Sequence, residues 1–261
     1  MRVGKEGARF TVHKVELTLV MENIMLSKIS ATQRFKAEHG WLKSYHLFSF
    51  ASYLERGNMN FGTLRVFNDD FIDGHSGFGA HTHDNMEIIT IVHKGTLTHQ
   101  DSLGNSGKIK SGEVQYMSAG TGVTHAELNQ SNEPVHLYQI WIFPDEQNLP
   151  PQYAQQDFSN SPANGLVPVA SGQSKPGAIK IRANATIYTA KIDPGQIIRH
   201  SLTSGRGLFV YVKEGRININ GTQFEKEDQA RITDETDILL KSDTHTEFIA
   251  IEVPMHLLRH A

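Results

Sequence analysis

This chain contains two short histidine-bearing segments, Phe78-Gly-Ala-His-Thr-His-Asp-Asn-Met-Glu87 and Gly122-Val-Thr-His-Ala-Glu127. The first holds a His-x-His pair and the second a His-x-Glu pair. Residues two apart in a β-strand project to the same face, so each pair offers two ligand atoms on one side of a sheet. If the two strands lie together, four nitrogen and oxygen ligands converge on one point. Such a set suits iron, nickel, copper, manganese or zinc, and the spacing does not choose among them.

The alternative is that these side chains are ordinary surface residues. The chain has 14 histidines, so chance pairs are expected, and a lone His-x-His is more often a surface feature than a metal site. Two such pairs, each beside turn glycines, favour a shared metal instead. We therefore predict that His81, His83, His125 and Glu127 meet at one metal site.

Composition narrows the class of protein. With 261 residues the chain can form one large or two small domains. Its net charge of −3 argues against a nucleic-acid binder, which usually carries a basic surplus. The absence of cysteine excludes disulfides and thiol catalysis and is compatible with the cytoplasm, where we expect the protein. No apolar run approaches the roughly 18 residues of a membrane span, so we expect no membrane partner.

The N-terminal segment does not read as a signal peptide, because Glu16 and Glu22 interrupt its apolar run. The alternation of Val15, Leu17 and Leu19 with polar residues predicts a strand instead. Met21 offers an alternative start, which would make residues 1–20 an extension of the natural protein.

Period-2 alternation predicts a mostly-β chain, and Asn220-Gly221 predicts a tight hairpin turn. Residues 144–185 are richer in Pro, Gln, Asn and Ser, and we expect an ordered crossover with a short helical turn rather than a floppy linker. The predicted strands are Met86–Val92, Val135–Ile142, Leu208–Val212, Arg216–Asn220 and Glu247–Val253.

The two halves of the chain have similar sequence patterns. Strand-like segments flank Gly95 in the first half and Gly215 in the second, which gives an offset of 120 residues. At this offset the positions of the first-half histidines and glutamate align with Ser, Thr and Gly, which are not typical metal ligands. His200 lies one residue before the position that aligns with His81, so it is predicted to point to the opposite face of its strand. A duplicated β-barrel with metal chemistry only in the N-terminal copy is therefore expected. The aligned positions are His81 with Ser201, His83 with Thr203 and Glu87 with Gly207.

These motifs resemble those of the cupin superfamily. The first cupin motif, G-x5-H-x-H-x3,4-E-x6-G, corresponds to Gly74, His81-Thr-His83, Glu87 and Gly95, with the first and last gaps each one residue longer. The second motif places a histidine three residues after a glycine, as His125 follows Gly122.

The resemblance is sharper to the pirin family of bicupins, whose metal-binding half is similar to residues 30–145. It implies an all-β fold of two tandem, jelly-roll-like cupin barrels, the second degenerate. We expect residues 21–145 to form the metal-binding cupin, and residues 146–261 to form the crossover and a cupin without metal ligands. The supporting segments are His39–Phe50, Leu64–Asp70, His99–Asn105 and Met117–Glu127.

The resemblance also implies a ligand set of His81, His83, His125 and Glu127 around one divalent transition metal. Iron is the first expectation, with nickel, copper, manganese, cobalt and zinc as alternatives. Glu87 would then lie beside the metal site and fix an imidazole tautomer. The alternative for Glu87 is a buried, hydrogen-bonded structural carboxylate.

Bacterial members of this family are described as quercetin 2,3-dioxygenases. We therefore expect a monomeric, metal-dependent dioxygenase that opens the heterocyclic ring of a flavonol with dioxygen, with Glu127 as the catalytic base. The alternatives are a non-enzymatic, metal-dependent regulator of a protein partner, a purely structural metal, and a different dioxygenase substrate.

An apolar pocket wide enough for a flat aromatic should surround the metal. Asn68 and Asp69 are expected to cap a turn, and His93 and His99 to be solvated. The candidate pocket residues are Phe48, Phe50, Phe67, Met117 and Trp141.

Overall fold

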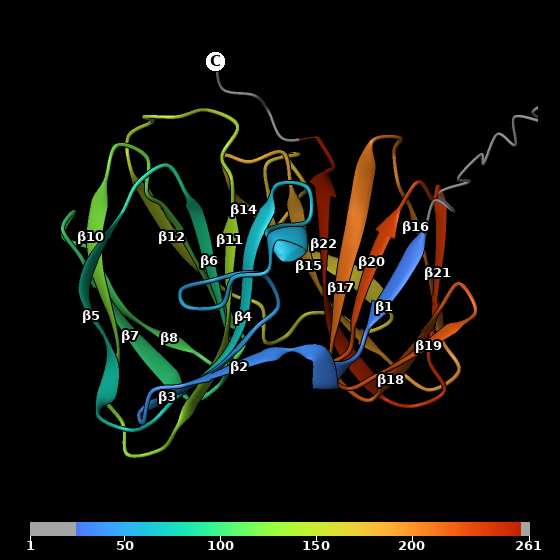
Figure 1. Ribbon diagram of the computed structural model, residues 1–261, viewed down its shortest axis with the longest axis horizontal. Coiled ribbons are helices and arrows are strands. Elements are labelled where there is room, and N and C mark those ends of the chain that lie inside the picture. Colours follow the sequence, from blue (N-terminus) through green and yellow to red (C-terminus); the bar gives the residue numbers. More distant parts are fainter. Residues whose placement is uncertain (1–24, 257–261) are drawn as a thin grey trace, which may run out of the picture.

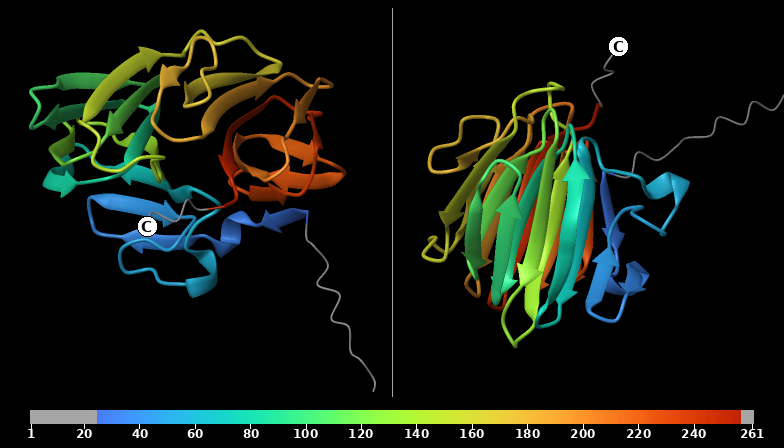
Figure 2. Two further views of the ribbon diagram at one scale, coloured as in Figure 1. Left: turned by 90° about the horizontal axis from the view of Figure 1, so that it is seen from above. Right: turned by 90° about the vertical axis from the view of Figure 1, so that its left-hand side faces the viewer.

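The computed structural model describes residues 25–256, which form 22 β-strands and two short 3-10 helices. Figure 1 shows two barrels side by side, and Figure 2 shows the same arrangement from above and from one end. The predicted all-β fold is confirmed. The expected strand at residues 15–19 and the possible extension of residues 1–20 lie outside the described residues.

In the N-terminal barrel, a seven-stranded sheet of order β12-β9-β6-β11-β4-β3-β2 faces a four-stranded sheet of order β5-β10-β7-β8. Its strands are β2 (Phe35–Glu38), β3 (Leu42–His46), β4 (Leu64–Ile72), β5 (Ser76–His83), β6 (Glu87–Lys94), β7 (Thr96–Asp101), β8 (Ser106–Lys110), β9 (Glu113–Ser118), β10 (Val123–Asn129), β11 (Val135–Ile142) and β12 (Gln152–Asp157). The helices are η1 (Ala31–Gln33) and η2 (Arg56–Asn58).

The C-terminal barrel repeats this plan, with sheets of order β1-β20-β17-β22-β15-β13-β14 and β16-β21-β18-β19. Its strands are β1 (Leu26–Ile29), β13 (Gly165–Ser171), β14 (Ile179–Lys180), β15 (Thr186–Ile192), β16 (Ile197–Ser201), β17 (Arg206–Glu214), β18 (Arg216–Ile219), β19 (Thr222–Glu225), β20 (Gln229–Thr233), β21 (Asp237–Lys241) and β22 (Thr246–Pro254).

All five predicted strands are present as β6, β11, β17, β18 and β22. The predicted hairpin is confirmed too, because Asn220 (φ 45°) and Gly221 (φ 89°) both adopt the positive φ that a type I′ turn needs. The helical turn expected within residues 144–185 is wrong. That segment is described throughout, and it holds strands β12, β13 and β14 and no helix.

The two barrels exchange edge strands. β1 pairs with β20 of the C-terminal barrel, and β12 pairs with β9 of the N-terminal barrel. Figure 1 shows the blue β1 lying beside β20. The chain therefore crosses between the barrels twice: β1, from the start of the described chain, pairs in the C-terminal barrel, and β12, from the expected crossover, pairs in the N-terminal barrel. Each exchanged strand covers a sheet edge that would otherwise be open to pairing.

The largest apolar core lies between the two seven-stranded sheets. Ile89 and Ile91 of β6 and Ile140 of β11 pack in one cluster with Phe209 of β17 and Ile249 of β22. Side chains alternate along a strand, so the residues between these point into the barrel interiors. The interior of the C-terminal barrel is itself filled by an apolar cluster that includes Leu208, Val210 and Phe248.

Asp69 ties the two barrels together beside this core. It lies within β4 and not at a turn, so the turn-capping role predicted for Asn68 and Asp69 is wrong. Its carboxylate accepts hydrogen bonds from Arg34 Nη1 (3.0 Å), from the Tyr211 hydroxyl of the C-terminal barrel (2.7 Å) and from His136 Nε2 (2.6 Å). Asp69 and Arg34 are both almost completely buried.

We predict that Asp69→Ala lowers the free energy of unfolding by about 3 kcal/mol, because it removes one of the two carboxylates that pair with the buried Arg34 guanidinium and leaves the Tyr211 hydroxyl without its acceptor. Urea unfolding midpoints measure the loss. The matched control is Asp73→Ala, which removes an exposed carboxylate directly after the same strand and should change stability little. Equal midpoints for the two variants would contradict the role assigned to Asp69.

Candidate metal centre

Strands β5 and β10 are neighbours in the four-stranded sheet, and their register sets the histidines against one another. His81 is the direct partner of His125, and His83 is the partner of Val123. The register shifts between His125 and Glu127, so that Glu127 faces Phe78. Gly77 allows this close approach, because a Cβ there would collide with the main chain of Glu127.

Three imidazoles form a compact cluster inside the N-terminal barrel. The ring centroids of His81 and His125 are 4.4 Å apart, those of His81 and His83 are 4.8 Å apart, and those of His83 and His125 are 5.0 Å apart. One ring nitrogen from each histidine lies within 4.8 Å of the others. Such spacing allows all three to reach a single ion.

The protonation states of these rings favour metal binding. His81 Nδ1 lies 2.8 Å from the Gly79 carbonyl, which holds a proton on Nδ1 and leaves Nε2 free. Burial, reinforced by the neighbouring His81, lowers the pKa of His83 to about 4 and that of His125 to about 3. Both rings are therefore neutral at pH 7, as metal ligands must be.

His125 supplies the observation that tests the fit of a metal. Both of its ring nitrogens are buried and have no hydrogen-bond partner within residues 25–256. Unpaired buried polar atoms are costly and rare in folded proteins. Nitrogen donors from three histidines, with a carboxyl group nearby, suit a divalent metal ion, so the residues present fit this group.

Glu127 follows on the same face of β10 and is fully buried. Gln139 Nε2 donates to its Oε2 at 2.9 Å, and the Thr90 hydroxyl lies 3.3 Å from its Oε1. Burial raises the pKa of Glu127 to about 7, although both hydrogen bonds oppose the rise. Its carboxylate lies within 4.8 Å of ring nitrogens of His125 and His99.

His99 is completely buried, so the expectation that it is solvated is wrong. Its Nε2 lies 3.1 Å from Asp101 Oδ2, and its Nδ1 lies 3.0 Å from the Gln115 amide nitrogen. Both ring nitrogens are therefore occupied, which excludes His99 as a free ligand. His99 lies two residues after the buried Leu97 on the same face of β7, and this spacing is the sequence signal for its burial. His93 is half-buried and lies against a cavity between the barrels.

Glu87 does not contact the histidines. Its carboxylate accepts hydrogen bonds from the Tyr116 hydroxyl (2.5 Å), the Ser118 hydroxyl (2.6 Å) and the Arg182 amide (2.8 Å). The expected hydrogen bond to an imidazole is absent from the described part of the chain. A turn at Asn85 (φ 44°) separates β5 from β6, so counting residues from His83 does not predict which face Glu87 takes. These three hydrogen bonds agree with the alternative interpretation, in which Glu87 is a buried structural carboxylate.

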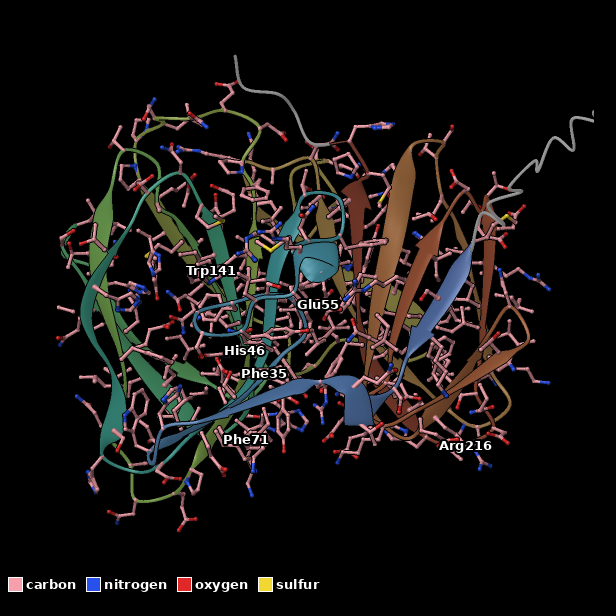
Figure 3. All side chains as sticks on the ribbon, in the orientation of Figure 1. Phe35, His46, Glu55, Phe71, Trp141 and Arg216 are labelled. Atoms are coloured by element: carbon pink, nitrogen blue, oxygen red, sulfur yellow. The ribbon has the colours of Figure 1, made fainter. Side chains whose placement is uncertain are left out.

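The histidines open into a pocket of about 160 Å³. Phe50 and Trp141 line it as predicted, and the Trp141 ring lies 4.9 Å from that of His83. Figure 3 places Trp141 within the N-terminal barrel. Phe48 and Phe67 belong instead to the core between the sheets, and Met117 packs in a small cluster with Ile88 and Val123. Further lining residues, not predicted from the sequence, are Asn68, Asp70, Phe78, Ile88 and Gln139.

Asp70 is the unexpected ionisable group of this pocket. Burial raises its pKa to about 7; the hydrogen bond from Ser44 opposes the rise, and the Asp69 and Glu127 charges add to it. The Asp70 side chain points toward the pocket because β4 alternates, whereas the neighbouring Asp69 points toward the other barrel.

The C-terminal barrel offers no equivalent cluster. Both groups of potential metal ligands found among residues 25–256 lie in the N-terminal barrel. His200 points inward, contrary to the prediction, with its Nε2 3.0 Å from Glu252, whose other oxygen pairs with Arg206. The 120-residue offset is therefore not kept along β16. An ion pair and apolar side chains occupy this barrel.

Comparison with known proteins agrees with this geometry. Residues 28–142 match the family model for pirin, and residues 168–253 match that for the quercetinase C-terminal cupin domain. The chain is 40% identical to a quercetin 2,3-dioxygenase of Escherichia coli (strain K12), with 86% of this chain and 96% of the relative covered. This chain belongs to the pirin family. The predicted family and two-barrel cupin fold are thereby confirmed.

Other relatives of this pirin carry different names. It is 40% identical to a pirin-like protein of Caulobacter vibrioides, over 83% of this chain and 94% of the relative. The crystal structure of the bacterial pirin YhhW from Escherichia coli in complex with nickel(II) superposes with a TM-score of 0.84, at 39% identity, covering 88% of this chain and 99% of that one. No helix within residues 25–256 is long and apolar enough to cross a membrane.

We predict that Glu87→Ala destabilises this pirin by about 3 kcal/mol, because it leaves buried donors unpaired, yet leaves the metal content of the purified protein unchanged. Urea midpoints and elemental analysis measure the two effects. Glu133→Ala, at an exposed position, is the control. Loss of metal without loss of stability would contradict this structural role and would instead support a role for Glu87 in metal binding.

The raised pKa of Asp70 predicts that the stability of the folded protein depends on pH. Its folded pKa is raised above the unfolded value, so its contribution to stability is complete below about pH 4 and is lost as pH rises through about 7. In metal-free protein, Asp70→Asn should therefore be about 2–4 kcal/mol more stable than wild type at pH 8 and nearly equal at pH 4. Urea midpoints at both pH values test this. A gain of equal size at the two pH values would contradict it.

Proposed function

We propose that this pirin is a metal-dependent dioxygenase that opens the heterocyclic ring of a flavonol such as quercetin. One observation carries the proposal. The unpartnered nitrogens of His125 stand beside two further histidines and a buried carboxyl group, at the inner end of an aromatic-walled pocket. The name of the Escherichia coli relative supports the same reaction class.

His81, His83, His125 and Glu127 would hold the metal. A divalent transition metal bound there supplies Lewis acidity toward a substrate hydroxyl and brings substrate and dioxygen together. Iron is our first expectation for this chain, with nickel the ion bound in the structure of the relative. The cytoplasmic location and the monomeric state expected from the sequence remain predictions.

The pocket walls would orient a flat substrate. Trp141 stands edge-on to both His83 and Phe50, at ring-centroid distances of 4.9 Å and 5.2 Å, and Phe78 closes another side. A volume of about 160 Å³ is smaller than the roughly 300 Å³ typical of a site that encloses a drug-sized molecule. The pocket would therefore enclose the reacting ring and leave the remaining ring at its mouth.

Glu127 would accept the proton of the flavonol 3-hydroxyl. The Gln139 amide fixes one carboxylate oxygen at 2.9 Å, and Gln139 is itself held by the Thr90 hydroxyl at 2.9 Å. The acceptor is thus oriented before substrate arrives, as general-base catalysis requires. The overall reaction consumes one dioxygen, breaks the two ring bonds at the hydroxyl-bearing carbon and releases that carbon as carbon monoxide.

We predict that metal-reloaded wild-type protein takes up dioxygen with quercetin, that His125→Ala loses both metal and uptake, and that Glu127→Gln is slowed at least 100-fold, on the order of a lost general base. An oxygen electrode and elemental analysis measure these effects. Glu133→Gln is the matched control, because Glu133 is exposed.

Two results would overturn this proposal. Normal turnover by Glu127→Gln would remove that residue from the chemistry. Stoichiometric metal binding without dioxygen uptake, for every metal of the series, would favour the metal-dependent regulatory alternative over an enzyme.

A further inference from the structure

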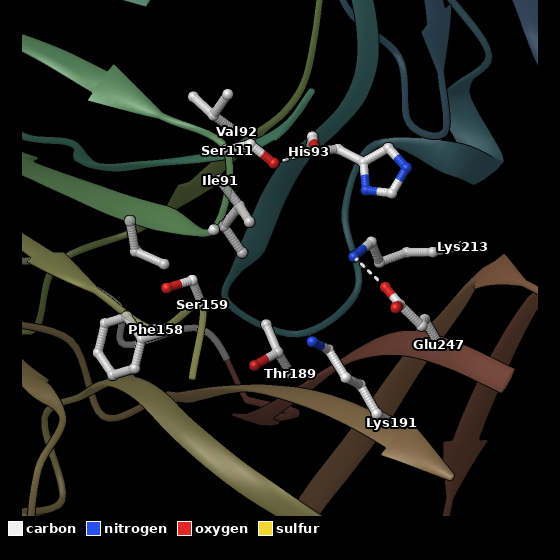
Figure 4. Close-up of a pocket in the computed structure, with 12 residues that line it drawn as sticks. Ile91, Val92, His93, Ser111, Phe158, Ser159, Thr189, Lys191, Lys213 and Glu247 are labelled. Carbon is white, nitrogen blue, oxygen red and sulfur yellow. Dashed lines mark hydrogen bonds and ion pairs between the residues drawn. The ribbon is translucent and has the colours of Figure 1, made fainter. Parts of the chain in front are cut away.

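A second cavity lies between the two barrels, on the face of β6 that points away from the metal pocket. It has a volume of about 340 Å³, within the range of small-molecule sites. Figure 4 shows its walls, which come from β6, β15, β17 and β22 and from the segments around Ser111 and Ser159. Sites between domains are common ligand sites.

The cavity begins where the apolar core between the sheets ends. Along β17 the core residues Phe209 and Tyr211 are followed on the same face by Lys213, and along β15 Ile187 is followed by Thr189 and Lys191. β-Strand alternation therefore aims both lysines into the space between the sheets. Figure 4 shows their ammonium groups turned toward the cavity.

The charges in this cavity do not balance. Lys213 Nζ is paired with Glu247 Oε2 at 3.0 Å. Lys191 is half-buried and lies opposite Glu247 in the sheet register, yet no carboxylate within residues 25–256 lies at ion-pair distance from its ammonium group. His93 adds no charge at pH 7, because burial and then Lys213 lower its pKa to about 4. One cation is left uncompensated.

The remaining lining divides into two parts. Ile91 and Val114 are buried, and the half-buried Phe158 presents an aromatic ring against them. Thr189 lies beside Lys191 on β15, and Ser159 lies near Phe158 (Figure 4). An apolar wall beside a single free cation and a hydroxyl donor matches a ligand that has one negative charge and a flat apolar body.

We propose that this cavity, the cleft between the two barrels, is a second binding site, for a small aromatic carboxylate. The carboxylate pairs with Lys191 and accepts a hydrogen bond from the Thr189 hydroxyl, while the aromatic ring packs against Phe158 and Ile91. A single uncompensated lysine suits a monoanion better than a dianion such as phosphate. The site uses none of the metal-binding residues, and it goes beyond the proposed dioxygenase function.

Benzoate titrated into the full-length, metal-loaded protein in a calorimeter tests this site. Lys191→Ala should weaken benzoate binding roughly tenfold, the loss expected for one charge-assisted contact. Lys180→Ala, at an exposed lysine of the same barrel, should leave the affinity unchanged. Benzamide, the neutral isostere, should bind at least tenfold more weakly than benzoate, on the same estimate.

His125→Ala separates this site from the metal centre, because benzoate could also bind a metal ion. Unchanged benzoate affinity in His125→Ala supports the cleft whether or not the dioxygenase proposal holds. Wild-type affinity in Lys191→Ala, equal binding of benzamide, or loss of binding in His125→Ala would each overturn the cleft as an aromatic carboxylate site.

Discussion

The two seven-stranded sheets pack against each other through a shared apolar core, and this packing decides which side chains reach the metal pocket. Ile89 and Ile91 of β6 are held in the core, so Thr90 between them and Ile88 before them must face the barrel interior. The same holds on β11, where Gln139 and Trp141 alternate with core residues. A slip of one residue would exchange the two faces, and burial of the core prevents it.

On the opposite wall of the pocket, the register between β5 and β10 decides which side chains meet. β5 and β10 set His81 directly against His125, and the next inward position of β10 carries Glu127. Gln139 reaches Glu127 from the seven-stranded sheet, so the site joins both sheets of the barrel. The inter-sheet core and the β5–β10 register together bring three imidazoles and one carboxyl group to the lining of a single pocket. The C-terminal barrel has the same architecture, but an apolar interior and the Arg206–Glu252 pair fill it.

Features confined to one strand could be predicted from the sequence, and features that depend on turns or on distant strands could not. The inward faces of His81 and His83 follow from period 2 along β5, and the positions of β6 and β11 follow from their own alternation. Glu87 could not be placed, because the turn at Asn85 resets the alternation. The pairing of β1 with β20 and that of β12 with β9 depend on the partner barrel. None of these pairings leaves a local signature.

The position of the metal itself is the most direct test of this account. A crystal of metal-loaded protein, measured with X-rays at the absorption edge of the metal, locates the ion by anomalous scattering. The geometry predicts one peak per chain in the N-terminal barrel, about 2.0–2.2 Å from ligand atoms of His81, His83, His125 and Glu127. A peak that contacts only one of the two strands, or one beside His99 away from His81 and His83, would contradict it.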